Sequence, residues 1–264
     1  MTVIGLLHPG EMGAAIGRCL VGAGHTVLWD PAGRGTATAS RAASAGLTAA
    51  AALPPGDRLT ALVRRSDVIL SVCPPHAALD VARGVADHGF TGIFTDANAI
   101  SPATARRVAG LVREGGAIYV DGGIIGPPPE APGHTRLYLS GAGAGCVRDL
   151  FAGTAVDARL AEGQEFAASA LKIAYAAWTK GTAALILAVR ALARAEGVEQ
   201  ALLAEWAMSQ PALEQRSERA AGSAASKGWR WVAEMREIAA SMSAAGLPTG
   251  FHEAAAEIFR RPPG

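Results

Sequence analysis

The stretch VIGLLHPGEMGAAIG, residues 3–17, decides the fold of this chain. A short apolar run, Val3–Leu7, is followed by a glycine-containing turn and then by the helical pattern Met12–Ala23. A strand, a glycine turn and a helix in this order are typical of the first βα unit of a dinucleotide-binding α/β domain. We therefore interpret residues 3–23 as the opening unit of such a domain.

The turn contains two of the three glycines of a dinucleotide-binding loop. Gly10 and Gly13 fit the second and third positions of the pattern G-x-G-x-x-G, and His8 stands at the first. In such a loop the pyrophosphate lies against the backbone, and the N–H groups at the helix N-terminus receive the phosphates. The motif predicts a bound nicotinamide dinucleotide, and a tight turn without a ligand is the alternative.

The residues after the second expected strand bear on the choice between NAD and NADP. Asp30 lies twenty residues after Gly10, where an acidic side chain can bind the ribose 2′-hydroxyl of NAD. Arg34, Thr36 and Arg41 follow closely, and an arginine with a hydroxyl suits a 2′-phosphate. We favour NADP because these three residues cluster, and NAD remains the alternative.

Short apolar runs alternate with helical patterns through the first half of the chain, which predicts a doubly wound, mostly parallel sheet with helices on both faces. This Rossmann-type α/β domain is expected to span residues 1–161. The expected strands are Val3–Leu7, Thr26–Trp29, Asp67–Val72, Gly92–Thr95, Ala117–Val120 and Arg136–Ser140. The expected helices are Met12–Ala23, Ala77–Ala86 and Pro102–Arg113.

Helical periodicity replaces this alternation beyond residue 161. The pattern predicts an all-α domain over residues 162–264. Its expected helices are roughly 164–196, 199–209, 212–222, 226–245 and 250–260.

Composition excludes several classes of function. The chain has 264 residues with 24 basic and 23 acidic side chains, so it lacks the positive charge that nucleic acid binding requires. Its three cysteines form no metal or disulfide pattern, which favours the cytoplasm and predicts no metal site. The most apolar stretch, Phe166–Val189, contains Lys172 and Lys180, so we expect no membrane span.

Lys172 is the strongest candidate for proton transfer. Lys172 and Lys180 are the only charged residues in Phe166–Val189, a helix that we expect to be packed on nearly all sides. Burial of an ammonium group lowers its pKa, which suits a general acid or base near neutral pH. The alternative is a lysine that extends its head group into water. Tyr175 follows on the same helix face and could share a polar network with it.

Five segments together resemble the β-hydroxyacid dehydrogenase superfamily, which includes 6-phosphogluconate dehydrogenase and the imine reductases. They are GLLHPGEMG (5–13), SVCPP (71–75), DANAISP (96–102), DGGIIGP (121–127) and SALKIAYAAWTKG (169–181). More narrowly, the chain looks like the 6-phosphogluconate-dehydrogenase-like proteins that carry a helical C-terminal domain of unassigned function.

The resemblance implies a set of cofactor residues, namely His8, Pro9, Gly10, Glu11, Met12, Gly13, Cys73, Pro74 and Asn98. Arg34 is added to them on its own chemistry, as a candidate for binding a 2′-phosphate. The resemblance also implies that residues 162–264 serve substrate binding and dimerisation. The substrate would lie near the turn Gly122–Gly126, at Gly122, Gly123, Ile125 and Glu234, with Lys172 and Tyr175 as catalytic residues.

Three departures from the family pattern bear on the substrate and the cofactor. Ile125 replaces the family's substrate-binding serine, and Ala176 replaces an asparagine that follows the lysine. Pro31, not Asp30, stands opposite the family's cofactor-specificity position.

The resemblance implies a cytoplasmic NAD(P)-dependent oxidoreductase that transfers a hydride between the nicotinamide and a small hydroxy acid, carbonyl or related substrate. It also implies a homodimer. Two alternatives remain: an imine reductase, and a nicotinamide-binding protein without turnover.

Overall fold

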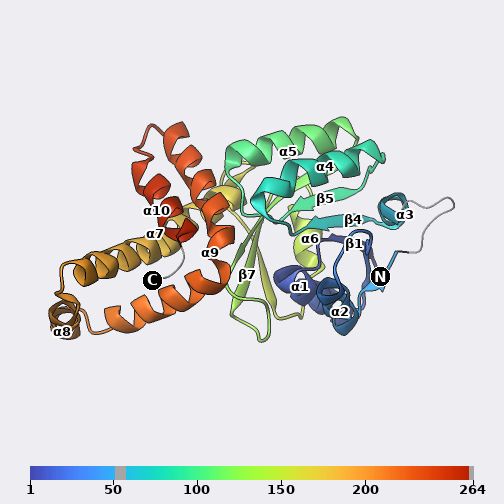
Figure 1. Ribbon diagram of the computed structural model, residues 1–264. Coiled ribbons are helices and arrows are strands. Elements are labelled where there is room, and N and C mark those ends of the chain that lie inside the picture. Colours follow the sequence, from blue (N-terminus) through green and yellow to red (C-terminus); the bar gives the residue numbers. More distant parts are fainter. Residues whose placement is uncertain (51–57, 262–264) are drawn as a thin grey trace. The chain divides into compact units, whose positions relative to one another are not determined.

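The computed structural model describes residues 1–50 and 58–261 (Figure 1). The chain divides into two compact units, Met1–Lys172 and Ile173–Gly264. Helix α7 (Ala167–Ala195) contributes its first residues to the first unit and the rest to the second. The domain boundary predicted between residues 161 and 162 stays a prediction.

The first unit contains a sheet with the strand order β3-β2-β1-β4-β5-β6-β7-β8 in the described part of the chain. Strands β1 to β6 are parallel, β7 is antiparallel to β6, and β8 is parallel to β7. The strands are β1 (Val3–Leu7), β2 (Thr26–Trp29), β3 (Thr48–Ala49), β4 (Val68–Ser71), β5 (Ile93–Asp96), β6 (Ile118–Ile125), β7 (Thr135–Ser140) and β8 (Val156–Leu160). The predicted doubly wound sheet is confirmed.

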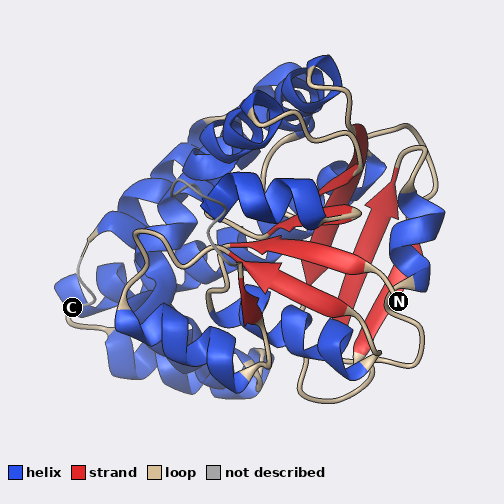
Figure 2. Cartoon of the chain, turned by 90° about the vertical axis from the view of Figure 1, so that its right-hand side faces the viewer, coloured by secondary structure: helices blue, strands red, loops and turns tan. Residues whose placement is uncertain are grey.

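Helices cover both faces of this sheet (Figure 2). One face packs against α1 (Glu11–Gly22), α2 (Thr36–Ser44) and α6 (Ala144–Asp149). The other packs against α3 (Arg58–Arg65), α4 (Ala78–Asp87) and α5 (Pro102–Glu114). A short 3₁₀ helix, η1 (Pro75–Ala77), precedes α4. The two apolar layers explain why the central strands are continuous apolar runs rather than alternating ones.

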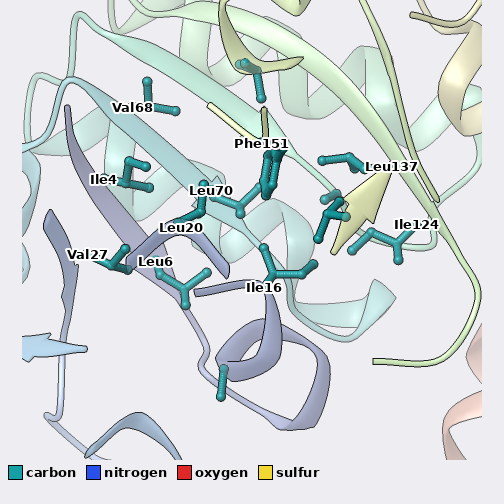
Figure 3. Packing of buried hydrophobic residues seen from close by; sticks show 14 of the residues in the cluster. Ile4, Leu6, Ile16, Leu20, Val27, Val68, Leu70, Ile124, Leu137 and Phe151 are labelled. Atoms are coloured by element: carbon teal, nitrogen blue, oxygen red, sulfur yellow. The ribbon is translucent and has the colours of Figure 1, made fainter. Parts of the chain in front are cut away.

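Strand β1 shows how the sequence builds these layers. Ile4 and Leu6 point into one apolar layer together with Ile16 and Leu20 of α1 (Figure 3). Gly5 faces α3, where an added Cβ would lie 2.6 Å from Leu62 Cδ2. Glycine at this position therefore allows the helix to pack directly on the strand.

Strand β6 is longer than predicted. The expected turn at Gly122–Gly126 is wrong, because residues 118–125 form one strand whose second half pairs with β7, with Gly123 opposite Tyr138 and Ile125 opposite Arg136. Glycine pairs are rare within strands, so the sequence indicated a turn. The turn begins at Gly126, where φ is +118°. Strands β3 and β8 and helices α2, α3 and α6 were also not predicted.

The second unit is helical, as predicted. It contains the remainder of α7 with α8 (Glu199–Ser209), α9 (Leu213–Ala244) and α10 (Gly250–Arg260). The prediction of two helices at 212–222 and 226–245 is wrong, because α9 is continuous through Gly222–Ser226. The small residues there lower helix propensity without breaking the helix, and the Ser226 hydroxyl donates to the Gly222 carbonyl (3.2 Å).

Helix α7 has one buried and one exposed apolar face. Ile173 and Ala176 belong to the core of the second unit. The exposed face carries large apolar side chains that are 40–66% exposed, namely Leu171, Tyr175, Trp178, Leu185 and Leu192. The expectation of a helix packed on nearly all sides is therefore wrong for this chain alone. Apolar character does not say whether the chain itself or a partner covers a face.

The length and composition of α7 would also allow it to cross a membrane. Its most apolar 18-residue window has a mean hydropathy of 1.2 and is 28% buried. A single helix of this kind is weak evidence for a membrane span, because the core helix of a globular protein meets the same criterion.

Candidate active site

The glycine turn after β1 forms the N-terminus of α1. Gly10 is the N-cap and supplies no side chain to cap the helix, and the space where its Cβ would be is open. An added Cβ at Gly13 would lie 2.6 Å from the His8 carbonyl oxygen. The two glycines therefore have different roles, because Gly13 allows the turn to close and Gly10 leaves room beside the helix terminus for a ligand.

His8 occupies the position of the missing first glycine and adopts its conformation. Its φ is +67°, in the left-handed region that favours glycine, and it is the only described residue other than glycine with a positive φ. Its Nε2 lies 2.9 Å from Nη2 of Arg34. Burial lowers the pKa of His8 to about 4, and the positive charge of Arg34 makes a smaller contribution in the same direction. Two predicted cofactor residues are thus in direct contact.

The segment after β2 forms a tight turn that presents Arg34. The Arg34 N–H donates to the Pro31 carbonyl (3.1 Å), Gly33 has a φ of +68°, and the Ala32 N–H donates to Asp30 Oδ1 (2.9 Å). A pocket opens beside this turn, and its lining includes His8, Asp30 and Arg34. Residues of β1, α3 and α4 complete the lining: Leu6, Leu7, Leu59, Asp80, Val81, Gly84 and Val85.

Arg41 and Thr36, which led us to favour NADP, do not line this pocket as Arg34 does. Arg41 donates to the Thr38 hydroxyl of its own helix (3.3 Å). Thr36 is the first residue of α2.

The loops after β4 and β5 are joined by Asn98. Its Oδ1 accepts from the Cys73 N–H (2.5 Å), and its Nδ2 donates to the Ser71 hydroxyl (3.1 Å). Burial raises the pKa of the Cys73 thiol to about 12, so this side chain is an uncharged group and not a nucleophile. Asn98 therefore fixes the spacing of the two predicted cofactor loops. An ordinary loop asparagine that satisfies the backbone would also accept the hydrogen bond from the Cys73 N–H.

The remaining predicted cofactor residues lie in the same two regions. Pro9 is buried in the glycine turn, Glu11 and Met12 begin α1, and Pro74 is the N-cap of η1.

A buried cluster of Asp121, Ser140 and Ser169 holds the first turn of α7 against the sheet. The Ser169 N–H donates to Asp121 Oδ2 (2.7 Å), and the Ser169 hydroxyl donates to Asp121 Oδ1. Ser140 Oγ of β7 accepts from the Ala168 N–H (3.1 Å) and lies 3.1 Å from Asp121 Oδ2. Side chains of β6 and β7 therefore satisfy N–H groups that the start of a helix leaves without partners.

Gly123 of β6 lets α7 approach closely enough to place Lys172 beside the strand. An added Cβ at Gly123 would lie 2.6 Å from the Ala168 carbonyl oxygen and 3.0 Å from Lys172 Cβ. Gly122 faces the end of β5 instead, where an added Cβ would lie 2.9 Å from the Asp96 carbonyl oxygen. Of the two predicted substrate residues, Gly123 thus contacts the predicted catalytic lysine, and Gly122 packs against β5.

Lys172 has the altered pKa that the sequence predicted. Burial lowers the pKa of Lys172 to about 8. Within the described parts of the chain, its ammonium group forms no ion pair that would counteract this effect. Tyr175, the predicted partner, is 45% exposed, and no hydrogen bond between described residues joins its hydroxyl to Lys172.

Glu234 pairs with Lys180 in the second unit. Its carboxylate accepts from the Lys180 ammonium, and both side chains are largely buried. The Lys180 ammonium also lies 5.6 Å from the centre of the Trp231 ring. Met235 and Ile238 on the same helix face are fully buried. Glu234 is therefore held in an interior ion pair of the second unit, and its substrate role stays a prediction.

Asp96 was not predicted as a site residue, although it is the first residue of the motif DANAISP. It is buried at the end of β5 beside Asp121 of β6, and its Oδ1 accepts from the Asn98 N–H (3.0 Å). Burial raises the pKa of Asp96 to about 7. A single acidic residue that ends an apolar strand, as in IFTD and IYVD, is the signal that could have identified Asp96 and Asp121.

We expect Asp96→Asn to flatten the pH dependence of stability. The unfolded chain releases this proton near pH 4 and the folded chain near pH 7, so the folded state binds more protons between these values. The free energy of unfolding therefore falls as pH rises from 4 to 7, by as much as about 4 kcal/mol. Urea unfolding at pH 4.5, 6 and 7.5 checks this. Equal slopes for the variant and the unmodified chain would contradict it.

Comparison with known proteins concerns the fold and part of the second unit. The fold is similar to that of a conserved protein described as structurally similar to 3-hydroxyacid dehydrogenases and to that of a 3-hydroxyisobutyrate dehydrogenase. Residues 193–261 match the family model described as a domain of unknown function, DUF1932. An uncharacterized 28.5 kDa protein of Methanothermus fervidus is 30% identical over 142 residues, 54% of each chain. The match thus spans about half the length of this curated relative.

Two solved structures illustrate the shared fold. The 3-hydroxyisobutyrate dehydrogenase of Mycobacterium tuberculosis is 22% identical with a TM-score of 0.70, over 98% of this chain and 93% of that one. A reductive aminase of Aspergillus terreus, solved with NADPH and ethyl levulinate, is 22% identical with a TM-score of 0.60, over 99% of this chain and 93% of that one.

Proposed function

We propose that this chain is an NADP-dependent oxidoreductase that acts on a small hydroxy acid, carbonyl or related substrate. The observation that carries the proposal is Lys172, whose pKa is lowered to about 8 by burial and which lies beside Gly123 on a helix anchored by Asp121. A group with this pKa can both donate and accept a proton near neutral pH.

The first unit fits a nicotinamide dinucleotide. The N-terminus of α1 has no side-chain cap, the space at Gly10 is open, and the adjoining pocket contains an arginine. These features suit a pyrophosphate at the helix terminus and a phosphorylated ribose near Arg34. The predicted contacts Cys73, Pro74 and Asn98 are proposed to lie along the nicotinamide half.

The residues of the chain would orient the reactants and move the proton. When bound, the nicotinamide supplies or accepts the hydride. Lys172 Nζ donates a proton to the substrate oxygen or nitrogen during reduction and accepts it during oxidation. The Asp121 cluster positions Lys172, and Gly123 allows α7 to pack against β6 beside it. The roles predicted for Gly122, Ile125, Tyr175 and Glu234 stay proposals.

An imine substrate is the second candidate, and two departures from the family pattern favour it. Ile125 and Ala176 are buried apolar residues, and they replace a serine and an asparagine of the family that the chain resembles. A site with fewer polar groups suits a cyclic imine better than a hydroxy acid.

A substrate panel tests the proposed activity. We expect NADPH labelled with deuterium at C4 to transfer the label to a short keto acid, an aldehyde or a cyclic imine in a stereospecific manner, as measured by mass spectrometry. Transfer to the imine alone would identify an imine reductase. Tight NADPH binding without label transfer to any compound would contradict the proposal and indicate a binding protein.

We further propose that the protein is a cytoplasmic homodimer in which the exposed apolar face of α7 contacts a second copy. Leu171, Tyr175, Trp178, Leu185 and Leu192 are spaced by four, three, seven and seven residues, which places them on one face of the helix. The three cysteines, Cys19, Cys73 and Cys146, are free thiols, as a reducing compartment would maintain them.

We expect light scattering to report a dimer at micromolar concentration and a monomer for Trp178→Glu, because the variant places a charge in the apolar contact. Met208→Glu is the matched control, since Met208 is 74% exposed on α8 and lies outside this face. A monomer for the unmodified chain would contradict the proposal.

A further inference from the structure

We infer that His8 is a positioning residue that orients Arg34 for the 2′-phosphate of the cofactor, so that a side chain in the glycine turn sets the selectivity between NADP and NAD. This inference rests on the proposed function and concerns the contact between His8 and Arg34. Both residues are predicted to contact the cofactor, but those predictions give no role to the contact between them.

Hydrogen bonds within the turn hold the backbone of Arg34 in place. The Arg34 N–H donates to the Pro31 carbonyl, and Gly33 in the left-handed region allows this turn. Asp30 reinforces the turn from the other side by accepting from the Ala32 N–H. The guanidinium itself is exposed, so without a further contact it would sample many rotamers.

The contact with His8 limits this freedom without using up the guanidinium. Arginine has only donors, so the 2.9 Å contact between Arg34 Nη2 and His8 Nε2 requires that Nε2 accept and that Nδ1 carry the proton. A guanidinium has five N–H donors, and this contact uses one of them. The others remain for a phosphate, which an arginine binds best through two parallel hydrogen bonds.

The backbone conformation of His8 supports a role in binding. A side chain at φ +67° is less favourable than glycine, and glycine would serve the turn equally well. Nδ1 of His8 is buried and has no hydrogen-bond partner among residues 1–50 and 58–261. With its proton on Nδ1, His8 has a donor left for an acceptor atom of the ligand, in the same pocket as Arg34.

Asp30 explains why the arginine must be oriented. Its carboxylate lines the same pocket and would repel a 2′-phosphate. One of its oxygens accepts from the Ala32 N–H, which holds the carboxylate in the turn. A guanidinium held at His8 places positive charge where the phosphate must bind.

Binding of two nucleotides that differ only in the 2′-phosphate tests the inference without any need for turnover. Calorimetry with adenosine 2′,5′-bisphosphate and adenosine 5′-monophosphate gives the ratio of their dissociation constants. We expect the unmodified chain to prefer the bisphosphate by about tenfold or more, which corresponds to about one charge-assisted contact. Arg34→Ala should abolish the preference.

The His8 variants separate the side chain from the turn. His8→Gly keeps a residue that adopts the positive φ of this turn, and it removes the side chain that accepts from Arg34. His8→Asn also adopts a positive φ, but its side chain is too short to reach Arg34. Both variants should lower the preference for the bisphosphate about fivefold to tenfold. The dissociation constant of the bisphosphate should rise, and that of the monophosphate should stay the same. His8→Gln places its Oε1 near the position of Nε2 and should restore much of the ratio. Arg107→Ala, the control at an exposed arginine of α5, should leave the ratio within about twofold.

The outcomes distinguish this inference from the proposed function. If His8→Gly and His8→Asn retain the ratio of the unmodified chain, His8 does not orient Arg34 and the inference is overturned, while cofactor binding stands. If the unmodified chain prefers the monophosphate, the inference is overturned together with the choice of NADP. If it binds neither nucleotide, the proposed function itself fails.

Discussion

Lys172→Ala is expected to lower kcat by about 10²- to 10⁴-fold for any accepted substrate, which is the usual contribution of a general acid or base. The dissociation constant for NADPH should change by no more than about twofold, because the glycine turn and Arg34 are untouched. Steady-state kinetics and fluorescence titration measure the two quantities. Lys227→Ala, which removes an exposed lysine of α9, is the matched control. An unchanged kcat would refute the proposed role.

The pH dependence of the same reaction gives an independent check. Because the pKa of Lys172 is about 8, the group is protonated below this pH and neutral above it. The value of kcat/KM should therefore fall above pH 8 for reduction and rise through pH 8 for oxidation. Lys172→Arg should not support oxidation at any pH in this range, since a guanidinium stays protonated. Parallel profiles in the two directions would contradict this assignment.

Asp121→Ala is expected to reduce the free energy of unfolding by about 2–6 kcal/mol, because it leaves two buried donors of Ser169 without an acceptor and each costs about 1–3 kcal/mol. It should also lower kcat, since the first turn of α7 positions Lys172. Urea unfolding followed by circular dichroism measures the loss of stability.

Two further variants show whether the loss belongs to this cluster. Asp121→Asn keeps an acceptor oxygen and removes a carboxyl whose pKa burial has raised, so it should be milder than the alanine variant. Asp157→Ala removes an exposed carboxylate paired with Arg159 and should cost less than about 1 kcal/mol. A loss as small for Asp121→Ala as for Asp157→Ala would show that the cluster does not hold α7.

The fold could be predicted from the sequence where local pattern and burial coincide. Val3–Leu7 and the residues after it contain both the apolar run and the turn, so the first βα unit was predicted within one or two residues. Strand β3 has only two residues, which is too short to show an alternation of apolar and polar side chains in the sequence. The second half of β6 depends on pairing with β7, and that pairing overrides the low strand propensity of Gly122 and Gly123.

The candidate site was predicted less completely, because its decisive contacts join residues far apart in the chain. The apolar neighbours of Lys172 in the sequence predicted a lowered pKa, and its catalytic role stays a prediction. The anchor of Lys172 could not be predicted, because Asp121 and Ser169 are 48 residues apart and meet only through the sheet. The contact between His8 and Arg34 also spans two loops. Whether the exposed face of α7 is covered depends on a second molecule, which the sequence of one chain does not describe.

The anchoring of α7 makes the position of Lys172 depend on the sheet. The N–H groups of the first turn of α7 bond to Asp121 and Ser140, which belong to β6 and β7. These two acceptors lie together only when the strands are paired, so the position of Lys172 depends on that pairing. Any local opening of the β6–β7 hairpin in the native state would release the start of α7 and displace the proposed proton donor. The free energy of this opening therefore determines the fraction of molecules in which the site is formed.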